Sequence, residues 1–157
     1  MLKRISIIAV ITIALLSLSS CSSWLGKVNI FPVEQDVTLG KQVSESFEQG
    51  NASIIMDSSK NTVVYRYIYG IRDSILKTNL LIHKNDFAWR IRIIQNDTIQ
   101  NAFCTPGGYI YVYTGLMKYL ESEDQLAGVM GHEMAHAEKR HSTDAMTREF
   151  DANLLLE

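Results

Sequence analysis

The stretch SEDQLAGVMGHEMAH, residues 122–136, decides the fold of this chain. It predicts an amphipathic helix that begins after Ser122, a good N-cap residue whose capping-box partner is Gln125. Apolar side chains recur along it with a period of roughly 3.6 residues, at Leu126, Val129, Met130 and Met134. Lys139, Arg140 and His141 place positive charge in the expected last turn, where the helix dipole favours it.

This helix carries the pattern His-Glu-x-x-His at His132, Glu133 and His136. Helix positions four apart differ by about 40° of rotation, so both imidazoles can reach one metal ion, and Glu133 can reach a water bound to it. Neutral imidazole nitrogen suits zinc, which lowers the pKa of its bound water towards about 7. The pattern predicts a zinc hydrolase, with a peptidase favoured. We expect His132 and His136 to bind one Zn²⁺ per chain and Glu133 to be catalytic.

Residues 1–20 have the features of a targeting segment. Lys3 and Arg4 precede an apolar run, residues 5–18, that is short for a membrane-spanning helix. The run ends in Leu-Ser-Ser-Cys, which resembles a bacterial lipobox. The resemblance implies a signal peptide, lipidation of Cys21 and a lipid anchor in the bacterial cell envelope. An uncleaved membrane anchor is the alternative.

Charge and cysteine content narrow the partners further. The net charge is −2 and falls to about −4 without residues 1–20, and no basic stripe is present, so we expect no nucleic-acid partner. Ser22, directly after the lipobox cysteine, implies the periplasmic face of the outer membrane rather than retention at the inner membrane. With Cys21 lipidated, Cys104 has no disulfide partner. We interpret Cys104 as a buried apolar side chain, with a free thiol near the site as the alternative.

The segments before the metal-binding helix predict helices first and strands afterwards. Helical spacing covers 37–49, 62–82 and 116–121, strand patterns cover 88–94, 98–103 and 109–113, and Pro-Gly-Gly at 106–108 predicts a turn. This order indicates an α+β fold, mostly helical, with a small antiparallel sheet. We expect the strand 109–113 to be an edge strand that pairs with an extended substrate. An ordinary core strand is the alternative. The expected substrate-binding residues are Gly108, Tyr109, Ile110, Tyr111 and Val112.

Two segments resemble the HtpX-like zinc metallopeptidases, which form metallopeptidase family forty-eight together with the CAAX prenyl proteases. NAFCTPGGYIYVYTGL at 101–116 is similar to the family segment N-A-F-x-x-P-G-G-x-I-x-V-x-x-G-L. QLAGVMGHEMAH at 125–136, followed by RHS at 140–142, resembles the family's active-site helix. The resemblance implies a zincin-like fold, zinc bound by His132 and His136, Glu133 as general base and strand 109–113 aligning the substrate. With the lipobox, it implies the periplasmic, outer-membrane lipoprotein branch and extended or misfolded polypeptides as substrates.

The chain departs from this family in its third zinc ligand. The family supplies a glutamate from a later E-x-x-x-D-like stretch. Glu149 in EFDAN resembles that motif faintly but follows His136 too soon. We therefore expect a truncated chain: a signal peptide at 1–20, a tether at 21–36, and the N-terminal part of a metallopeptidase domain at 37–157. His141 is disfavoured as a third ligand, because on a continuous helix it lies about 180° from His132.

Three functions remain open at this point. The first is a zinc endopeptidase that cleaves extended or misfolded chains. The second is a non-catalytic periplasmic binder or chaperone of unfolded chains, because catalytic zinc sites generally have three protein ligands and this sequence offers two clear ones. The third is an inactive fragment that exposes apolar surface. The sequence does not distinguish oligomeric states.

Overall fold

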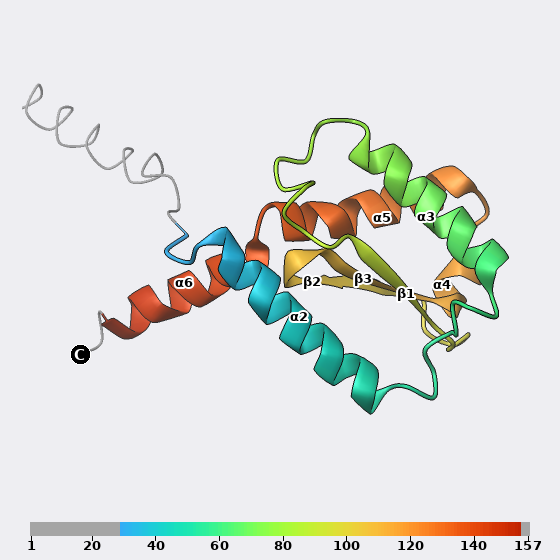
Figure 1. Cartoon of the computed structure of the whole chain (residues 1–157), viewed down its shortest axis with the longest axis horizontal. Helices are drawn as coiled ribbons and strands as arrows, with labels where there is room; N and C mark the ends of the chain where they lie inside the picture. Colours follow the sequence, from blue (N-terminus) through green and yellow to red (C-terminus); the bar gives the residue numbers. More distant parts are fainter. Residues whose placement is uncertain (1–28, 155–157) are drawn as a thin grey trace, which may run out of the picture.

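A computed structural model of the chain describes residues 29–154 (Figure 1). Cys21 and the signal segment 1–20 lie outside the described residues. Along residues 29–154, no helix is long and apolar enough to cross a bilayer. The elements follow in the order α2 (Val33–Gly50), α3 (Thr62–Leu76), β1 (Arg90–Ile94), β2 (Ala102–Thr105), the 3-10 turn η2 (Pro106–Gly108), β3 (Tyr109–Tyr113), α4 (Thr114–Tyr119), α5 (Glu123–Glu138) and α6 (His141–Leu154).

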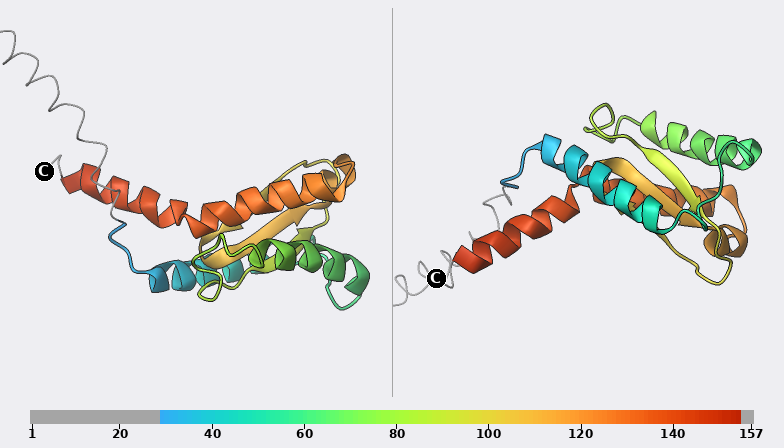
Figure 2. Two further views of the ribbon diagram at one scale, coloured as in Figure 1. Left: turned by 90° about the horizontal axis from the view of Figure 1, so that it is seen from above. Right: turned by 60° about the horizontal axis from the view of Figure 1, so that its bottom comes forward.

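The strands form one mixed sheet in the order β1-β3-β2. Strand β3 pairs with β1 in parallel and with β2 in antiparallel fashion. Helices α3 and α5 lie on one side of the sheet and α2 on the other, while α6 extends away from the body of the domain (Figures 1 and 2). The fold is therefore α+β, with the sheet between two helical layers.

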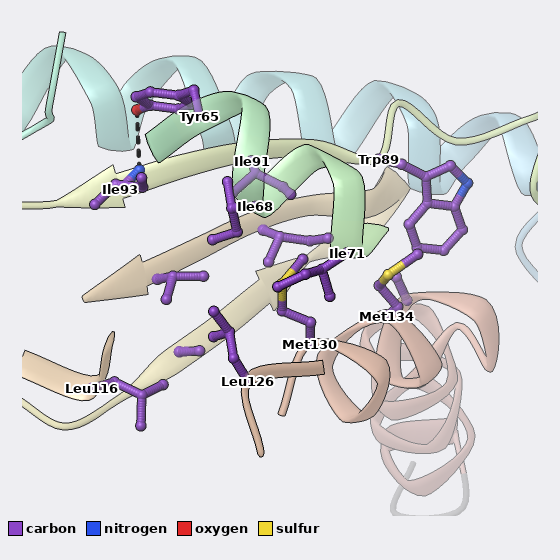
Figure 3. Close-up of a cluster of buried hydrophobic side chains, with 14 of the residues drawn as sticks. Tyr65, Ile68, Ile71, Trp89, Ile91, Ile93, Leu116, Leu126, Met130 and Met134 are labelled. Carbon is purple, nitrogen blue, oxygen red and sulfur yellow. Dashed lines mark hydrogen bonds between the residues drawn. The ribbon is translucent and has the colours of Figure 1, made fainter. Parts of the chain in front are cut away.

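The apolar core fills the space between the sheet and helices α3 and α5 (Figure 3). Alternate strand residues point to this side, and those of β1 and β3 are fully buried: Ile91, Ile93, Ile110 and Val112. They meet Tyr65, Ile68 and Ile71 of α3 and Leu126, Met130 and Met134 of α5. The burial of Met130 and Met134 fixes the helical turn between them, which includes His132 and Glu133 on the opposite, more exposed side.

The other face of the sheet packs on α2 through aromatic and charged side chains. The Tyr111 ring stacks on Phe103 and meets Phe47 of α2 edge-on, with ring centroids 4.8 Å apart in each pair. Glu48 of α2 forms ion pairs with Arg90 and with Arg92, the latter at 3.1 Å. These contacts hold α2 against β1 and β3.

The position of β3 corrects the expectation of an antiparallel sheet with β3 at its edge. The strand forms at Tyr109–Tyr113, as predicted, but it lies in the centre of a mixed sheet with both edges paired. The alternating pattern indicates a strand but does not reveal its neighbours, and the parallel pairing with β1 joins segments far apart in sequence. The backbone groups of Tyr109, Ile110, Tyr111 and Val112 are thus used within the sheet, and Gly108 is buried in the turn before it.

Two helix boundaries also differ from the sequence prediction. Helix α2 begins at Val33, within the segment expected to be a tether, and α3 ends at Leu76 rather than near Ile82. Residues before α2 contact α6: the Asn29 side chain donates a hydrogen bond to Thr143 Oγ1 at 2.7 Å. Contacts between residues so far apart in the sequence leave no periodic pattern in it, so the sequence did not predict them.

Glycine is required where α2 crosses the η2 turn. A Cβ added at Gly40 would lie 1.8 Å from the carbonyl oxygen of Pro106. Gly107 in this turn has φ of +70°, a left-handed conformation that glycine adopts without strain. The close approach of α2 places the η2 turn, and therefore the ends of β2 and β3, relative to the helix.

We predict that Gly40→Ala destabilises the fold by about 1–3 kcal/mol or more, because helix and turn must separate to admit the methyl group. The matched control is Gly70→Ala in α3, where an added Cβ meets no atom within 4 Å. That change should stabilise the protein by up to about 1 kcal/mol, since alanine favours helix over glycine. Urea denaturation of both variants measures the difference, and equal stabilities would contradict the packing described here.

A buried ion pair sits where α5 gives way to α6. Arg140, between the two helices, has φ of +54°, a left-handed conformation unusual for a residue with a Cβ. Its Nε donates to Asp36 Oδ2 at 2.7 Å, and Nη2 donates to the carbonyls of Phe31 and Pro32 at 2.6 and 3.0 Å. Asp36 is only 1% exposed and also accepts from Thr143 Oγ1 at 3.0 Å. The network ties α2 to the break between α5 and α6.

We predict that Asp36→Asn lowers the free energy of unfolding by about 3 kcal/mol, because it leaves the Arg140 guanidinium without its buried counter-charge. Glu45→Gln is the control. It changes a carboxylate to an amide on the same helix, where Glu45 is 4.0 Å from Lys41 and 57% exposed. That surface pair should contribute less than about 1 kcal/mol. Denaturant titration measures the free energy of unfolding of both variants. If both lose a similar amount, the buried pair contributes no more stability than the surface pair.

Candidate active site

Helix α5 forms as the sequence predicts at its start and differs at its end. The Ser122 hydroxyl accepts a hydrogen bond from the Gln125 backbone N–H at 3.3 Å, and the Gln125 side chain accepts from the Glu121 N–H at 2.7 Å. The helix ends at Glu138, whereas Lys139, Arg140 and His141 were expected in its last turn. The left-handed Arg140 stops it there, so Lys139 is the C-cap of α5, whereas His141 is the first residue of α6.

His132 and His136 present their Nε2 atoms to each other at 3.0 Å, from successive turns of the helix. Two nitrogens bound to one tetrahedral zinc at about 2.0–2.1 Å lie about 3.3 Å apart. A small opening of the two exposed rings would therefore admit the ion, so the donor set fits zinc. The assignment of these two residues as ligands stays a prediction.

A third ligand is not found among residues 29–154. No group of three or more His, Cys, Asp or Glu side chains in this part of the chain is arranged to hold a metal ion. Glu149, the weak candidate from the sequence, is exposed on α6, the helix that extends away from the domain (Figure 1). Nothing in the described part of the chain therefore supports Glu149 as a ligand.

A pocket of about 200 Å³ lies beside the two histidines, between α5, β2 and the start of α6. Glu133 and His136 line it from α5, Cys104 and Thr105 from β2, and His141 from α6. The glutamate predicted to be catalytic thus faces the same pocket as one of the predicted ligands. The arrangement suits acid–base chemistry on a group bound there.

Cys104 is a neutral thiol rather than a reactive one. Burial, and secondarily the nearby negative charge of Glu133, raises its pKa far above the usual range for cysteine. Its Sγ donates a weak hydrogen bond to the carbonyl of Thr105 at 3.3 Å. Because the thiolate is the form that binds metals and attacks electrophiles, the structure favours the interpretation of Cys104 as a packing residue.

The edge of the sheet nearest the pocket belongs to β2, which sequence reasoning did not assign to substrate. The Tyr113 N–H donates to the carbonyl of Asn101 at 3.1 Å. In an antiparallel ladder this bond directs the backbone groups of Phe103 and Thr105 towards β3, and those of Ala102 and Cys104 outward. In the described residues no strand pairs with that outer edge.

The opposite edge of the sheet is covered. The Tyr65 hydroxyl accepts from the Ile93 N–H at 3.2 Å, and the Tyr69 hydroxyl accepts from the Ile91 N–H at the same distance. The Met56 N–H completes the cover by donating to the Ile93 carbonyl at 2.8 Å. The sequence signal for the open β2 edge was the strand pattern at 98–103, which overlaps β2 only at residues 102 and 103.

His141 lies beside the site, although on a continuous helix it would point away from His132. It is the first residue of α6, and its Nδ1 is 2.7 Å from Nδ1 of His136. Partial desolvation, followed by the neighbouring His136, lowers the pKa of His141 below its usual range. The expectation that His141 lies in the last turn of a continuous helix was wrong, because the left-handed Arg140 ends α5 and His141 begins α6.

Comparison with known proteins places this arrangement in a family. Residues 70–155 match Peptidase family M48. The chain is 39% identical over 66 residues, 42% of this chain and 13% of the relative, to Mitochondrial metalloendopeptidase OMA1 of Arabidopsis thaliana. The OMA1 of Schizosaccharomyces pombe is 41% identical over 66 residues, 41% of this chain and 19% of the relative. Beta-barrel assembly-enhancing protease of Escherichia coli K12 is 44% identical over 54 residues, 34% of this chain and 11% of the relative.

These matches cover between a third and a little over two fifths of this chain, and a much smaller part of each relative. The segments cover less than a fifth of the length of the three curated relatives. The family match, in contrast, takes in more than half of the chain and includes β1, β2, β3 and all of α5 with its His-Glu-x-x-His pattern. The chain therefore belongs to peptidase family M48.

Proposed function

We propose that this chain carries the catalytic helix of a zinc-dependent endopeptidase that cleaves extended or misfolded polypeptides at the periplasmic face of a bacterial outer membrane. The observation that supports it most directly is the 3.0 Å approach of the His132 and His136 Nε2 atoms beside the Glu133 pocket. Membership of a peptidase family supports the reaction class, and the names of the relatives, metalloendopeptidase and protease, agree with it.

The chemistry divides between the metal and the glutamate. Zinc, when bound, lowers the pKa of its water and polarises the scissile carbonyl. The Glu133 carboxylate takes a proton from the attacking water and delivers it to the leaving amine nitrogen. Its place in the same pocket as His136 gives it access to both positions. The nearby Cys104 thiol is protonated in the metal-free chain, because burial raises its pKa.

The open edge of β2 would hold the substrate in place of β3. The outward backbone groups of Ala102 and Cys104 can pair with an extended chain, and Cys104 lines the pocket that contains Glu133. Backbone pairing reads an extended conformation and is largely indifferent to side chains. This mode of recognition suits misfolded polypeptides, which expose backbone that folded proteins bury.

The proposed location in the cell depends on the N-terminal sequence. The lipobox resemblance at Leu18 to Cys21 and the Ser22 that follows support a lipid anchor at Cys21 and the HtpX-like, periplasmic lipoprotein branch of the family. The Escherichia coli relative is named a beta-barrel assembly-enhancing protease, which is compatible with substrates in the cell envelope. The partners under this proposal are polypeptide substrates and, through the anchor, the membrane.

We predict that Glu133→Gln lowers the rate of cleavage of an unfolded protein by about 10²–10⁴-fold, the usual contribution of a general base. Zinc binding, measured by equilibrium dialysis, should be kept, because the amide leaves both histidines in place. The assay uses the full chain in detergent with added zinc, and Glu123→Gln on the exposed first turn of the same helix is the control. Equal cleavage by wild type and Glu133→Gln would overturn the mechanism.

A second function, a non-catalytic binder of unfolded chains, is favoured by one observation. Among the described residues no three His, Cys, Asp or Glu side chains are arranged to hold one metal ion, whereas catalytic zinc sites usually have three protein ligands. The same dialysis separates the two functions. A chain that binds unfolded polypeptide through the β2 edge but takes up no zinc and cleaves nothing is a binder.

Pairing along β2 makes a prediction about the substrate backbone. A peptide N-methylated at several consecutive central residues should bind about 10-fold more weakly than the unmethylated peptide, since two lost hydrogen bonds cost about 0.5–1.5 kcal/mol each. A peptide with the same composition in scrambled order should bind within about threefold, because the backbone contacts are unchanged. Fluorescence anisotropy on Glu133→Gln, which should not cleave the probe, measures both. Insensitivity to methylation would argue against recognition by the sheet edge.

A further inference from the structure

The His136 imidazole is engaged at both of its nitrogens. Its Nε2 faces Nε2 of His132 at 3.0 Å, and its Nδ1 faces Nδ1 of His141 at 2.7 Å. Two ring nitrogens at the latter distance form a hydrogen bond in which one nitrogen carries the proton and the other accepts it. The pair therefore has two possible arrangements, which differ in which imidazole donates.

The metal-facing side of His136 selects between these arrangements. A nitrogen that binds a cation must present its lone pair, so Nε2 of a neutral His136 is unprotonated and the single ring proton sits on Nδ1. That proton then points to His141, whose Nδ1 must accept it. His141 thus occupies the position that a carboxylate or a backbone carbonyl takes behind many metal-binding histidines.

The backbone holds His141 in this position. Because the His141 residue is exposed, its placement depends on the break before it rather than on packing of its own ring. Arg140 adopts its left-handed φ of +54° with the guanidinium bound to Asp36, and its carbonyl accepts from the Asp144 N–H at 2.9 Å to begin α6. The orientation of the first α6 side chain is therefore set by contacts to α2.

We propose that His141 is a positioning residue for His136: it accepts the Nδ1 proton of His136 and thereby fixes the tautomer and ring orientation in which His136 Nε2 faces the metal. The proposal rests on the proposed zinc function for the identity of the cation. It gives a role to a residue outside the His-Glu-x-x-His pattern. On a continuous helix His141 would have pointed away from His132, so the sequence alone did not suggest this role.

Two substitutions of similar size at His141 test whether it acts as a hydrogen-bond acceptor or only fills space. Asparagine at this position can offer its Oδ1 near the place of the histidine Nδ1, whereas leucine offers no acceptor. We predict that His141→Leu weakens zinc binding, measured by chelator competition on the full chain in detergent, by about 10–100-fold. His141→Asn should stay within about threefold of wild type. His83→Leu, which removes an imidazole that pairs with Asp86 instead, should bind zinc as wild type does.

The hydrogen bond itself provides a second readout. In the zinc-loaded protein, proton NMR should show the His136 Nδ1–H as a slowly exchanging resonance in wild type and in His141→Asn. In His141→Leu this proton should exchange faster with water, because its protein acceptor is gone. A melting temperature close to that of wild type confirms that each variant is folded, as expected for an exposed residue.

The outcomes distinguish this proposal from the proposed function. If zinc binds with equal affinity to wild type and His141→Leu, or if the His136 Nδ1–H exchanges equally fast in both zinc-loaded proteins, the positioning role is overturned while the metal site stands. If His136→Ala binds zinc as wild type does, the metal assignment itself fails, and the positioning role fails with it. Equal loss of zinc affinity in His141→Asn and His141→Leu would also overturn the role as acceptor.

Discussion

The buried ion pair between Asp36 and Arg140 is the contact on which the geometry of the site depends. A left-handed backbone at a residue with a Cβ costs on the order of 1–3 kcal/mol, and helices usually end with glycine in that conformation. Here an arginine occupies it, with its guanidinium bound to a carboxylate and to two carbonyls at the start of α2. These charge-assisted hydrogen bonds offset both the strain and the desolvation of the charges.

This constraint links elements that are distant in sequence. Helix α2 crosses the η2 turn at Gly40, and the same helix supplies Asp36 to the break after α5. The turn precedes β3 and follows β2, so one helix sets both the sheet edge and the start of α6 relative to α5. The pocket between β2, α5 and α6 is therefore defined by α2, although only Asp36 of that helix lines it.

The parts of this structure that local sequence determines were predictable, and those set by distant contacts were not. The cap at Ser122, the helix after it and the strand at 109–113 follow from hydrogen-bonding residues and periodicity within a few positions. The central place of β3 depends on parallel pairing with β1, which no local pattern encodes. The break at Arg140 has neither glycine nor proline to announce it, because its cause is an aspartate more than a hundred residues earlier.

One face of α5 packs into the core, and the opposite face carries the residues of the candidate active site. Met130 and Met134 are fully buried against the sheet, whereas His132 and His136 lie on the exposed side of the same turns. A polar group in water carries little desolvation cost, so histidines and a glutamate can gather there without weakening the core. Their orientation must then come from elsewhere, since exposed side chains have few packing contacts. The imidazole at the start of α6, aimed back at His136 by the Arg140 break, supplies an orienting contact that the helix surface does not.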